Sequence, residues 1–223
     1  MRVGILFSGG KDSTFAAFLA KKNDYDISCL ISVVSENPFS FMFHTPSISQ
    51  ISKQAESIGV PLIIEKTAGE KELELAALEK CIRTAVEKYS IEGVVTGAVE
   101  SVYQASRIQK ICNRLSIECF NPLWQKDQLE LLDDLLKNGF DVIITGIAAF
   151  PLDESWLGRK IDRQFIGEVR SLSEKFKINP AGEGGEFESF VLDCPLFKRK
   201  LNVKDSRVVS FGEFHKVLEV VIE

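Results

Sequence analysis

Short apolar runs and amphipathic segments alternate through the first hundred residues, and no other feature of the sequence restricts the fold more. The apolar runs predict strands at residues 3–7, 27–34, 62–65 and 94–97, and segments with apolar residues at helical spacing lie between them. Runs that are apolar throughout are typical of parallel strands covered on both faces. The sequence therefore predicts an α/β fold with a doubly wound parallel sheet, whose ligands bind beyond the carboxyl ends of the strands.

Regular alternation stops after Pro122. Asp127 predicts the start of a helix that Gly139 ends. The expected inner face of this helix carries Leu129, Leu132 and Leu136. Further predicted elements are strands at residues 140–150, 187–193 and 207–211 and a helix at residues 165–176. We therefore expect a main domain at residues 1–126 and a smaller α+β C-terminal domain at residues 127–223.

A six-residue loop links the first strand to the first helix, and its residues are Ser8, Gly9, Gly10, Lys11, Asp12 and Ser13. Backbone N–H groups and the positive end of the helix dipole converge there on an anion. The glycines let the backbone approach, Lys11 adds a positive charge, and the two serines can donate hydrogen bonds. The loop is therefore predicted to bind phosphate, and a tight turn with a solvated lysine is the alternative.

Asp12 is the unusual member of this loop because a carboxylate repels phosphate unless a cation lies between them. We predict a contact between Asp12 and Mg²⁺, direct or through water, with a helix cap as the alternative role. The loop is not a Walker A loop, which needs a glycine where this chain has Ile5 and a serine or threonine where it has Asp12. The dinucleotide fingerprint G-x-G-x-x-G is also absent from the sequence.

The charge balance argues against a protein that binds nucleic acid stably. Lys and Arg number 27 against 32 Asp and Glu, so the net charge is -5. The cysteines are odd in number and scattered, which predicts buried thiols rather than disulfides or a zinc site; they are Cys29, Cys81, Cys112, Cys119 and Cys194. A signal peptide and an apolar stretch long enough for a bilayer are both missing from the sequence, so we expect a cytoplasmic protein without membrane contact.

A second glycine-rich loop precedes the predicted strand at residues 187–193. Its residues are Gly182, Glu183, Gly184, Gly185, Glu186, Phe187, Glu188 and Ser189. Flexible backbone with clustered carboxylates favours a cation, either a metal or a positively charged organic group. Aromatic faces for a quaternary ammonium could come from Phe187, Trp156, Trp124 and Tyr103. An exposed acidic turn is the alternative interpretation.

Both loops resemble one enzyme family. The loop at residues 8–13 is similar to the PP-loop of the N-type ATP pyrophosphatases, which cleave ATP between the α and β phosphates. Residues 183–189 resemble the signature of the diphthine–ammonia ligases (diphthamide synthases) within that class. Other blocks of that family are similar to stretches of this chain in the same order: Phe41-Met42-Phe43-His44, Gln54-Ala55, Gly97-Ala98, Ser101, Tyr103-Gln104, Arg107 and Pro122-Leu123-Trp124.

The resemblance implies a reaction and a fold. The reaction is the ATP-dependent amidation, by ammonium, of the carboxylate of diphthine on translation elongation factor 2. It proceeds through an acyl adenylate and gives diphthamide, AMP and pyrophosphate, with ATP and Mg²⁺ as cofactors. The fold is an ATP-binding domain of the HUP, adenine nucleotide alpha hydrolase-like type at residues 1–126 and a substrate-binding domain at residues 127–223.

The resemblance also suggests roles for individual residues. Lys11, Asp12 and Glu186 are the expected catalytic residues, with Glu186 holding ammonium and accepting its proton. The expected ATP-binding residues are Ser8, Gly9, Gly10, Lys11, Asp12, Ser13 and Gly97. The expected substrate-binding residues are Tyr103, Gln104, Arg107, Glu183, Gly184, Gly185, Glu186 and Glu188. His44 is a candidate contact for the nucleotide or the substrate, and a packing role is its alternative. Arg107 is either a site residue or a partner in a surface ion pair.

Several alternatives stay open at this point. Another PP-loop ATP pyrophosphatase, which modifies tRNA or makes a small amide, is the nearest one, although Cys-x-x-Cys pairs and a glutaminase cysteine after Met1 are missing. A non-catalytic nucleotide-binding sensor is the alternative from a different class. The basic residues at 198–200, with Lys204 and Arg207, are either a solvated loop or a contact for the elongation factor or its bound RNA. The length resembles the compact archaeal form of the ligase, and the sequence is compatible with a homo-oligomer.

Overall fold

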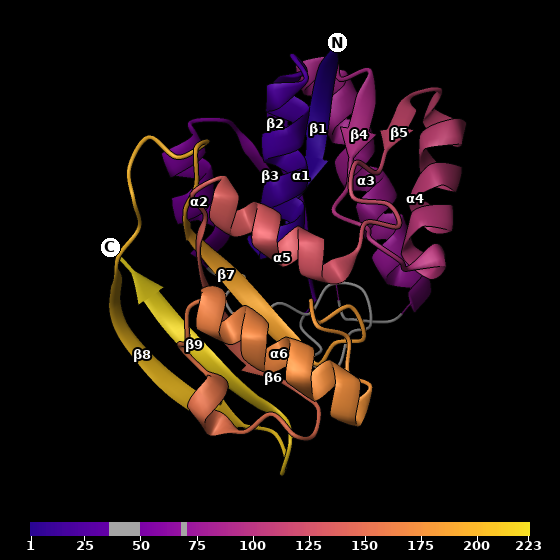
Figure 1. Ribbon diagram of the computed structural model, residues 1–223. Coiled ribbons are helices and arrows are strands. Elements are labelled where there is room, and N and C mark those ends of the chain that lie inside the picture. Colours follow the sequence, from indigo (N-terminus) through magenta and orange to yellow (C-terminus); the bar gives the residue numbers. More distant parts are fainter. Residues whose placement is uncertain (36–49, 68–70) are drawn as a thin grey trace.

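The structure is a computed structural model that describes residues 1–35, 50–67 and 71–223. Five parallel strands form the first sheet, in the upper part of Figure 1, in the order β3-β2-β1-β4-β5. Their bounds are Arg2–Leu6 for β1, Asp26–Ser35 for β2, Leu62–Thr67 for β3, Gly93–Val95 for β4 and Glu118–Phe120 for β5. The predicted doubly wound parallel sheet is confirmed, and its strand order reverses between β1 and β4. The sequence pattern had not predicted β5, which has only three residues.

Helices cover both faces of this sheet. They are α1 (Lys11–Lys22), α2 (Ile51–Ile58), α3 (Lys71–Tyr89) and α4 (Val102–Leu115). Side chains of α1 and α2 pack in one cluster with Leu30 of β2, whereas side chains of α3 and α4 pack in another with Ile31. Consecutive strand residues point to opposite faces, so a strand apolar on both faces needs helices on both sides.

The second sheet is antiparallel and has the order β7-β6-β9-β8. Its strands are β6 (Asp141–Ile147), β7 (Phe187–Asp193), β8 (Val203–Ser210) and β9 (Lys216–Ile222), and α5 (Gln128–Lys137), η2 (Glu154–Trp156) and α6 (Arg163–Phe176) complete this part. The structure matches the predicted bounds of β7, ends β6 earlier than expected and makes β8 longer. It also adds β9, which the sequence analysis missed.

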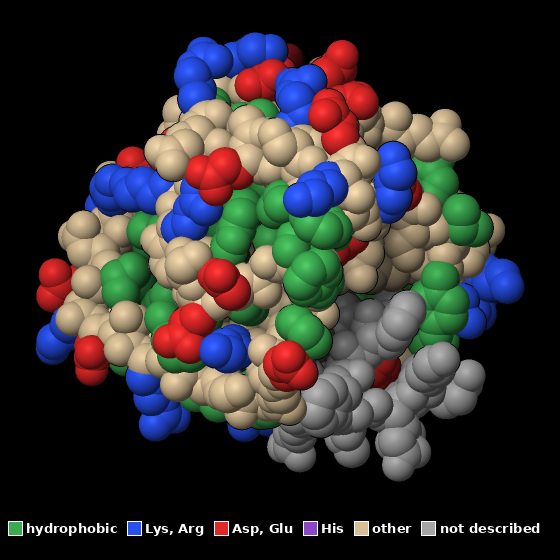
Figure 2. Space-filling view, turned by 60° about the horizontal axis from the view of Figure 1, so that its bottom comes forward, with side chains coloured by type: hydrophobic (Ala, Val, Ile, Leu, Met, Phe, Trp, Pro, Cys, Tyr) green, Lys and Arg blue, Asp and Glu red, His purple; other side chains and the backbone are tan. Residues whose placement is uncertain are grey.

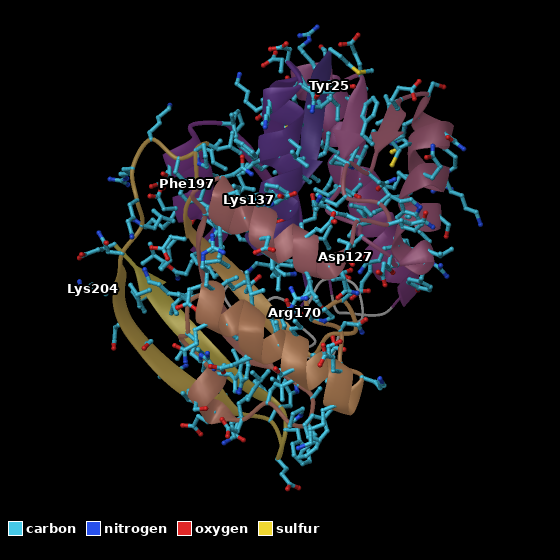
Figure 3. All side chains as sticks on the ribbon, viewed as in Figure 1. Tyr25, Asp127, Lys137, Arg170, Phe197 and Lys204 are labelled. Carbon is cyan, nitrogen blue, oxygen red and sulfur yellow. The ribbon has the colours of Figure 1, made fainter. Side chains whose placement is uncertain are left out.

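Asp127 caps α5 as predicted, because its side chain accepts hydrogen bonds from the N–H groups of Leu129 (3.0 Å) and Glu130 (2.9 Å). Figure 3 labels Asp127 and Lys137 at the two ends of this helix. The predicted inner face is shifted: the structure buries Leu131, Leu132 and Leu135, whereas Leu129 and Leu136 are only half-buried. The shift arises because α5 packs against α6 as well as against the core that both parts share.

One hydrophobic core joins the two parts of the chain. The ring of Phe140, just before β6, packs edge-on against Phe15 of α1 at 5.4 Å and against Phe18 at 5.7 Å. In Figure 1, α5 lies between the two sheets and beside α6. The second sheet is therefore held against the α1 side of the first.

Candidate functional site

A cavity of about 750 Å³ lies where the carboxyl ends of the first sheet's strands meet the second sheet. One wall consists of the end of β1, residues 8–13 without Gly9, part of β2 and residues 96–98. The opposite wall consists of residues 146–148, the glycine-rich loop and the start of β7. The two loops that the sequence analysis singled out, far apart in the chain, thus face one cavity at the switch point of the sheet.

Gly9 allows the sharp turn of the phosphate-binding loop, since its φ is +78°. The Gly9 carbonyl accepts hydrogen bonds from Gln54 Nε2 (2.9 Å) and from the N–H of Val191 in β7 (3.1 Å). The Ser8 and Ser13 hydroxyls lie 3.1 Å apart. This arrangement puts the N-terminus of α1, with its positive dipole end, on the cavity wall.

Lys11 is the buried cation of the cavity, with only 3% of its surface exposed. Its Nζ lies 2.7 Å from Asp12 Oδ2 and 5.7 Å from the centre of the Phe187 ring. Burial by itself lowers the pKa of Lys11, but the carboxylates of Asp12, Glu183 and Glu188 outweigh it and leave the pKa raised. Lys11 therefore stays charged and can attract phosphate oxygens.

Asp12 presents the second oxygen of its carboxylate, Oδ1, in a buried position where none of the described residues offers a hydrogen bond. A buried carboxylate oxygen without a donor fits a cation, and Mg²⁺ prefers such ligands. The described residues contain no group of three or more His, Cys, Asp or Glu arranged for a metal. Asp12 alone suits Mg²⁺ that is held mainly by the phosphates of a nucleotide.

Glu183 and Glu188 line the cavity from the side of the second sheet. The pKa of each is raised to about 7, mainly by burial and also by the nearby Asp12, while Lys11 opposes the shift. Glu100, which also lines the cavity, adds to the effect on Glu183. A carboxylate with this pKa can both hold and release a proton near neutral pH.

Glu186 is hydrogen-bonded within its own glycine-rich segment. Its Oε1 accepts hydrogen bonds from the N–H of Asn179 (2.7 Å) and from Asn179 Nδ2 (2.8 Å), and its Oε2 accepts one from the N–H of Gly184 (2.8 Å). The residue is buried, and it is missing from the described residues that line the cavity. Both oxygens of Glu186 thus hold the glycine-rich loop in shape, and proton transfer to Glu186 stays a prediction.

Gly97 follows β4 at a point where the chain passes very close to α1. A Cβ atom on Gly97 would lie 2.6 Å from the backbone nitrogen of Ser13, which no real side chain tolerates. Gly97 and Gln104 both line the cavity, and Ser101 caps α4 by accepting a hydrogen bond from the N–H of Gln104 (3.3 Å).

Tyr103 and Arg107 are not among the described residues that line the cavity. The Arg107 guanidinium lies 3.4 Å from the centre of the Tyr103 ring and donates to the Tyr103 carbonyl. Of the four aromatic residues that were predicted to offer a face to a cation, only Phe187 lines the cavity. Trp156 packs against Phe165 instead. The candidate contact His44 lies outside the described residues.

Two buried polar residues belong to the site although the sequence analysis assigned them no role there. Gln54 is fully buried and Ser189 is 5% exposed. A signal for Gln54 existed, because it is a polar residue on the apolar face of α2. Ser189 closes the motif at residues 183–189, but sequence spacing does not show that its hydroxyl reaches Lys11.

Three of the basic residues near the C-terminus form ion pairs. Arg199 pairs with Glu56, Lys200 with Asp141 and Arg207 with Glu219. On the face seen in Figure 2, Lys and Arg alternate with Asp and Glu around hydrophobic side chains. None of the described helices has the length and apolar character needed to cross a membrane.

Comparisons with known proteins agree with this arrangement. Residues 1–119 match the model of the diphthamide synthase N-terminal domain, and residues 127–219 match that of the diphthamide synthase C-terminal domain. The U34-tRNA thiolase NcsA from Methanococcus maripaludis, with its [4Fe-4S] cluster, superposes with a TM-score of 0.39 at 17% identity over 83% of this chain and 70% of that one.

Relatives named diphthine–ammonia ligase are similar to this chain over nearly its whole length. The protein from Schizosaccharomyces pombe is 34% identical over 96% of this chain, which spans 38% of the length of that relative. The relatives from Bos taurus (34%) and Homo sapiens (33%) each match 94% of this chain, which spans 85% of their length. Because the two domain models and these relatives cover both sheets and both cavity loops, the chain belongs to the diphthamide synthase family.

Proposed function

We propose that this protein is a diphthine–ammonia ligase, which uses ATP and ammonium to convert the carboxylate of diphthine on translation elongation factor 2 into an amide. The observation that carries the proposal is the single cavity in which the loop at residues 8–13 faces the acidic loop at residues 182–189. Relatives that bear this name match both loops and the chain around them. The proposal places the enzyme in the cytosol, where elongation factor 2 works.

In the first step, ATP lies with its phosphates over residues 8–13 and near Gly97. The diphthine carboxylate attacks the α-phosphorus, an acyl–phosphate bond forms, and the bond to the β-phosphate breaks so that pyrophosphate leaves. Lys11 and the N-terminus of α1 stabilise the negative charge that develops on the leaving group. Asp12 would hold Mg²⁺, which supplies additional charge neutralisation on the phosphates.

In the second step, ammonia attacks the acyl carbon, the amide bond forms and AMP leaves. Ammonium must first lose a proton, and we assign its acceptance to Glu183 or Glu188, because both line the cavity and the pKa of each is about 7. The negative charge of Glu183 and Glu188 also favours binding of the trimethylammonium group of diphthine. Glu186, Gly184 and Gly185 shape the loop, and Gln104 is the substrate contact expected from α4; contacts from Tyr103 and Arg107 remain predictions.

The test combines the purified protein with ATP, Mg²⁺, ammonium and elongation factor 2 that carries diphthine. We expect AMP and pyrophosphate in equal amounts, with the acid-to-amide mass change on the modified histidine. Elongation factor 2 without diphthine is the control and should give neither product. AMP release that does not depend on diphthine would contradict the proposal and favour a tRNA or small-molecule substrate. ATP binding without AMP release under any of these conditions would instead indicate a nucleotide sensor.

A further inference from the structure

Strand β7 of the second sheet contacts the phosphate-binding loop of the first through its backbone and one side chain. The N–H of Lys11 donates to Ser189 Oγ at 3.1 Å, and the N–H of Val191 donates to the Gly9 carbonyl at 3.1 Å. A Cβ on Gly10 would lie 3.2 Å from the Ser189 carbonyl, so the two backbones are in close contact. Residues of the loop and of β7, about 180 positions apart in the sequence, are thus hydrogen-bonded to each other.

Gln54 of α2 contacts both the loop at residues 8–13 and β7. Its side chain is fully buried, and its Nε2 donates both to the Gly9 carbonyl at 2.9 Å and to the Val191 carbonyl at 2.8 Å. Gln54 therefore ties the loop and β7 together with one amide group. A buried amide in such a position strongly favours one arrangement of its partners, since moving either would leave a donor unsatisfied.

Helix α1, which begins inside the loop at Lys11, explains why these contacts matter for nucleotide binding. The N-cap residue of α1 is Gly10, which has no side chain to accept a hydrogen bond from the first turn. The hydroxyl of Ser189 takes over that capping role from the second sheet, and it does so at Lys11. The direction of the Lys11 backbone, and with it the phosphate-binding loop, is set by a strand outside the nucleotide domain.

We propose that Ser189 and Gln54 are positioning residues for ATP, which hold the loop at residues 8–13 in the shape that binds phosphate. The inference rests on the proposed function only for the identity of the nucleotide. With this role for Ser189, the second sheet is part of the ATP site, in addition to lying on the side of the cavity that Glu183 and Glu188 line. The loop and the substrate side of the cavity are thereby held at a constant separation.

Ser57 offers a matched control for a purely structural role. It is 1% exposed, its hydroxyl donates to the Arg199 carbonyl, and it accepts a hydrogen bond from the Arg199 N–H. Ser57 thus also joins the two parts of the chain through a buried hydroxyl, but it is absent from the described cavity wall. Loss of either hydroxyl should lower thermal stability, whereas only loss of Ser189 should change nucleotide affinity.

The experiment measures binding of α,β-methylene ATP with Mg²⁺ by titration calorimetry, which needs no turnover because this analogue resists cleavage between the α and β phosphates. We expect Ser189→Ala to weaken binding about fivefold, the effect of one lost helix cap. Ser57→Ala should leave the affinity within about twofold of the wild type, and Ser189→Thr, which keeps the hydroxyl, should restore it. Gln54→Met keeps the length of the side chain without the donors and should also weaken binding.

Unchanged affinity in Ser189→Ala and Gln54→Met would overturn the inference, as would equal losses in Ser189→Ala and Ser57→Ala. Should Ser189→Ala not fold, Ser189→Cys replaces it, because sulfur is a weak acceptor of similar size. The proposed function has its own readout. A wild type that binds the analogue but forms no amide on diphthine contradicts the ligase activity and leaves the inference on Ser189 standing.

Discussion

At the scale of single residues, the buried charges of the cavity determine what it can bind. Lys11 is positive and almost inaccessible, while Asp12, Glu183 and Glu188 bring negative charge close to it. One wall thus suits phosphate, and the other suits ammonium or a quaternary ammonium. The proposed substrate, with a carboxylate and a cationic group, matches these two walls.

Lys11→Gln removes the positive charge with little change in shape. We expect the rate of AMP formation to fall about 100-fold or more, because the charge that develops on pyrophosphate loses its main partner. Lys21→Gln, in the exposed last turn of the same helix, is the matched control and should retain activity. Pyrophosphate release measured at saturating ATP tests this, and equal rates for the two variants would contradict the role of Lys11.

Glu188→Gln should change how stability depends on pH. The pKa of Glu188 is raised to about 7 mainly by burial, so between pH 4.5 and 7 the folded protein holds a proton that the unfolded chain has released. Stability from this group is therefore lost as the pH rises through that window. Relative to wild type, the variant should gain unfolding free energy between pH 5 and pH 8, measured by urea denaturation. Glu87→Gln, at an exposed position of α3, is the control. A difference between Glu188→Gln and wild type that stays constant over this pH range would count against the titration of Glu188.

At the scale of elements, the contact between the end of β4 and the start of α1 sets the width of the nucleotide side of the cavity. Only glycine fits at position 97, because a Cβ atom on any other residue would clash with the backbone of Ser13. The conformation of the loop is thus decided by three neighbours: β4, α2 and β7. Sequence patterns predicted Gly97 and the strand β7, but not that β7 contacts the loop at residues 8–13.

Gly97→Ala should abolish binding of α,β-methylene ATP and lower the melting temperature, since the backbone of Asp12 and Ser13 must move to admit the methyl group. Gly167→Ala in α6 is the control, because a Cβ there meets nothing within 4 Å. That substitution should leave binding intact and stabilise the helix by up to about 1 kcal/mol. Calorimetry and thermal unfolding on both variants test the pair, and analogue binding retained by Gly97→Ala would refute the close approach.

At the scale of the whole molecule, the two sheets share one core rather than meeting as separate bodies. Phe140 stands at the centre of this arrangement, 5% exposed and in ring contact with Phe15 and Phe18 of α1. Two parts that bury one another's apolar faces should unfold together. The cavity between them then exists only in the complete fold.

Phe140→Ala should destabilise the whole protein by about 3–5 kcal/mol, because it leaves a cavity in the shared core. Circular dichroism and tryptophan fluorescence should report a single, coincident transition in both the wild type and the variant. Phe211→Ala, at a site that is 42% exposed, is the control and should change stability by less than about 1 kcal/mol. Two separate transitions would show that the parts fold independently.

The parallel sheet and the loops at residues 8–13 and 182–189 could be predicted without a structure, because local hydrophobic periodicity and short glycine motifs encode them. Which carboxylates face the cavity depends instead on how the chain folds. Glu186 and Glu188 are two positions apart, yet one is tied into its loop by three donors and the other lines the wall. The capping of Lys11 by Ser189 was equally beyond sequence analysis, since contacts across about 180 residues depend on how the second sheet docks through Phe140. Long-range packing, which no local pattern records, therefore set the chemistry of this site.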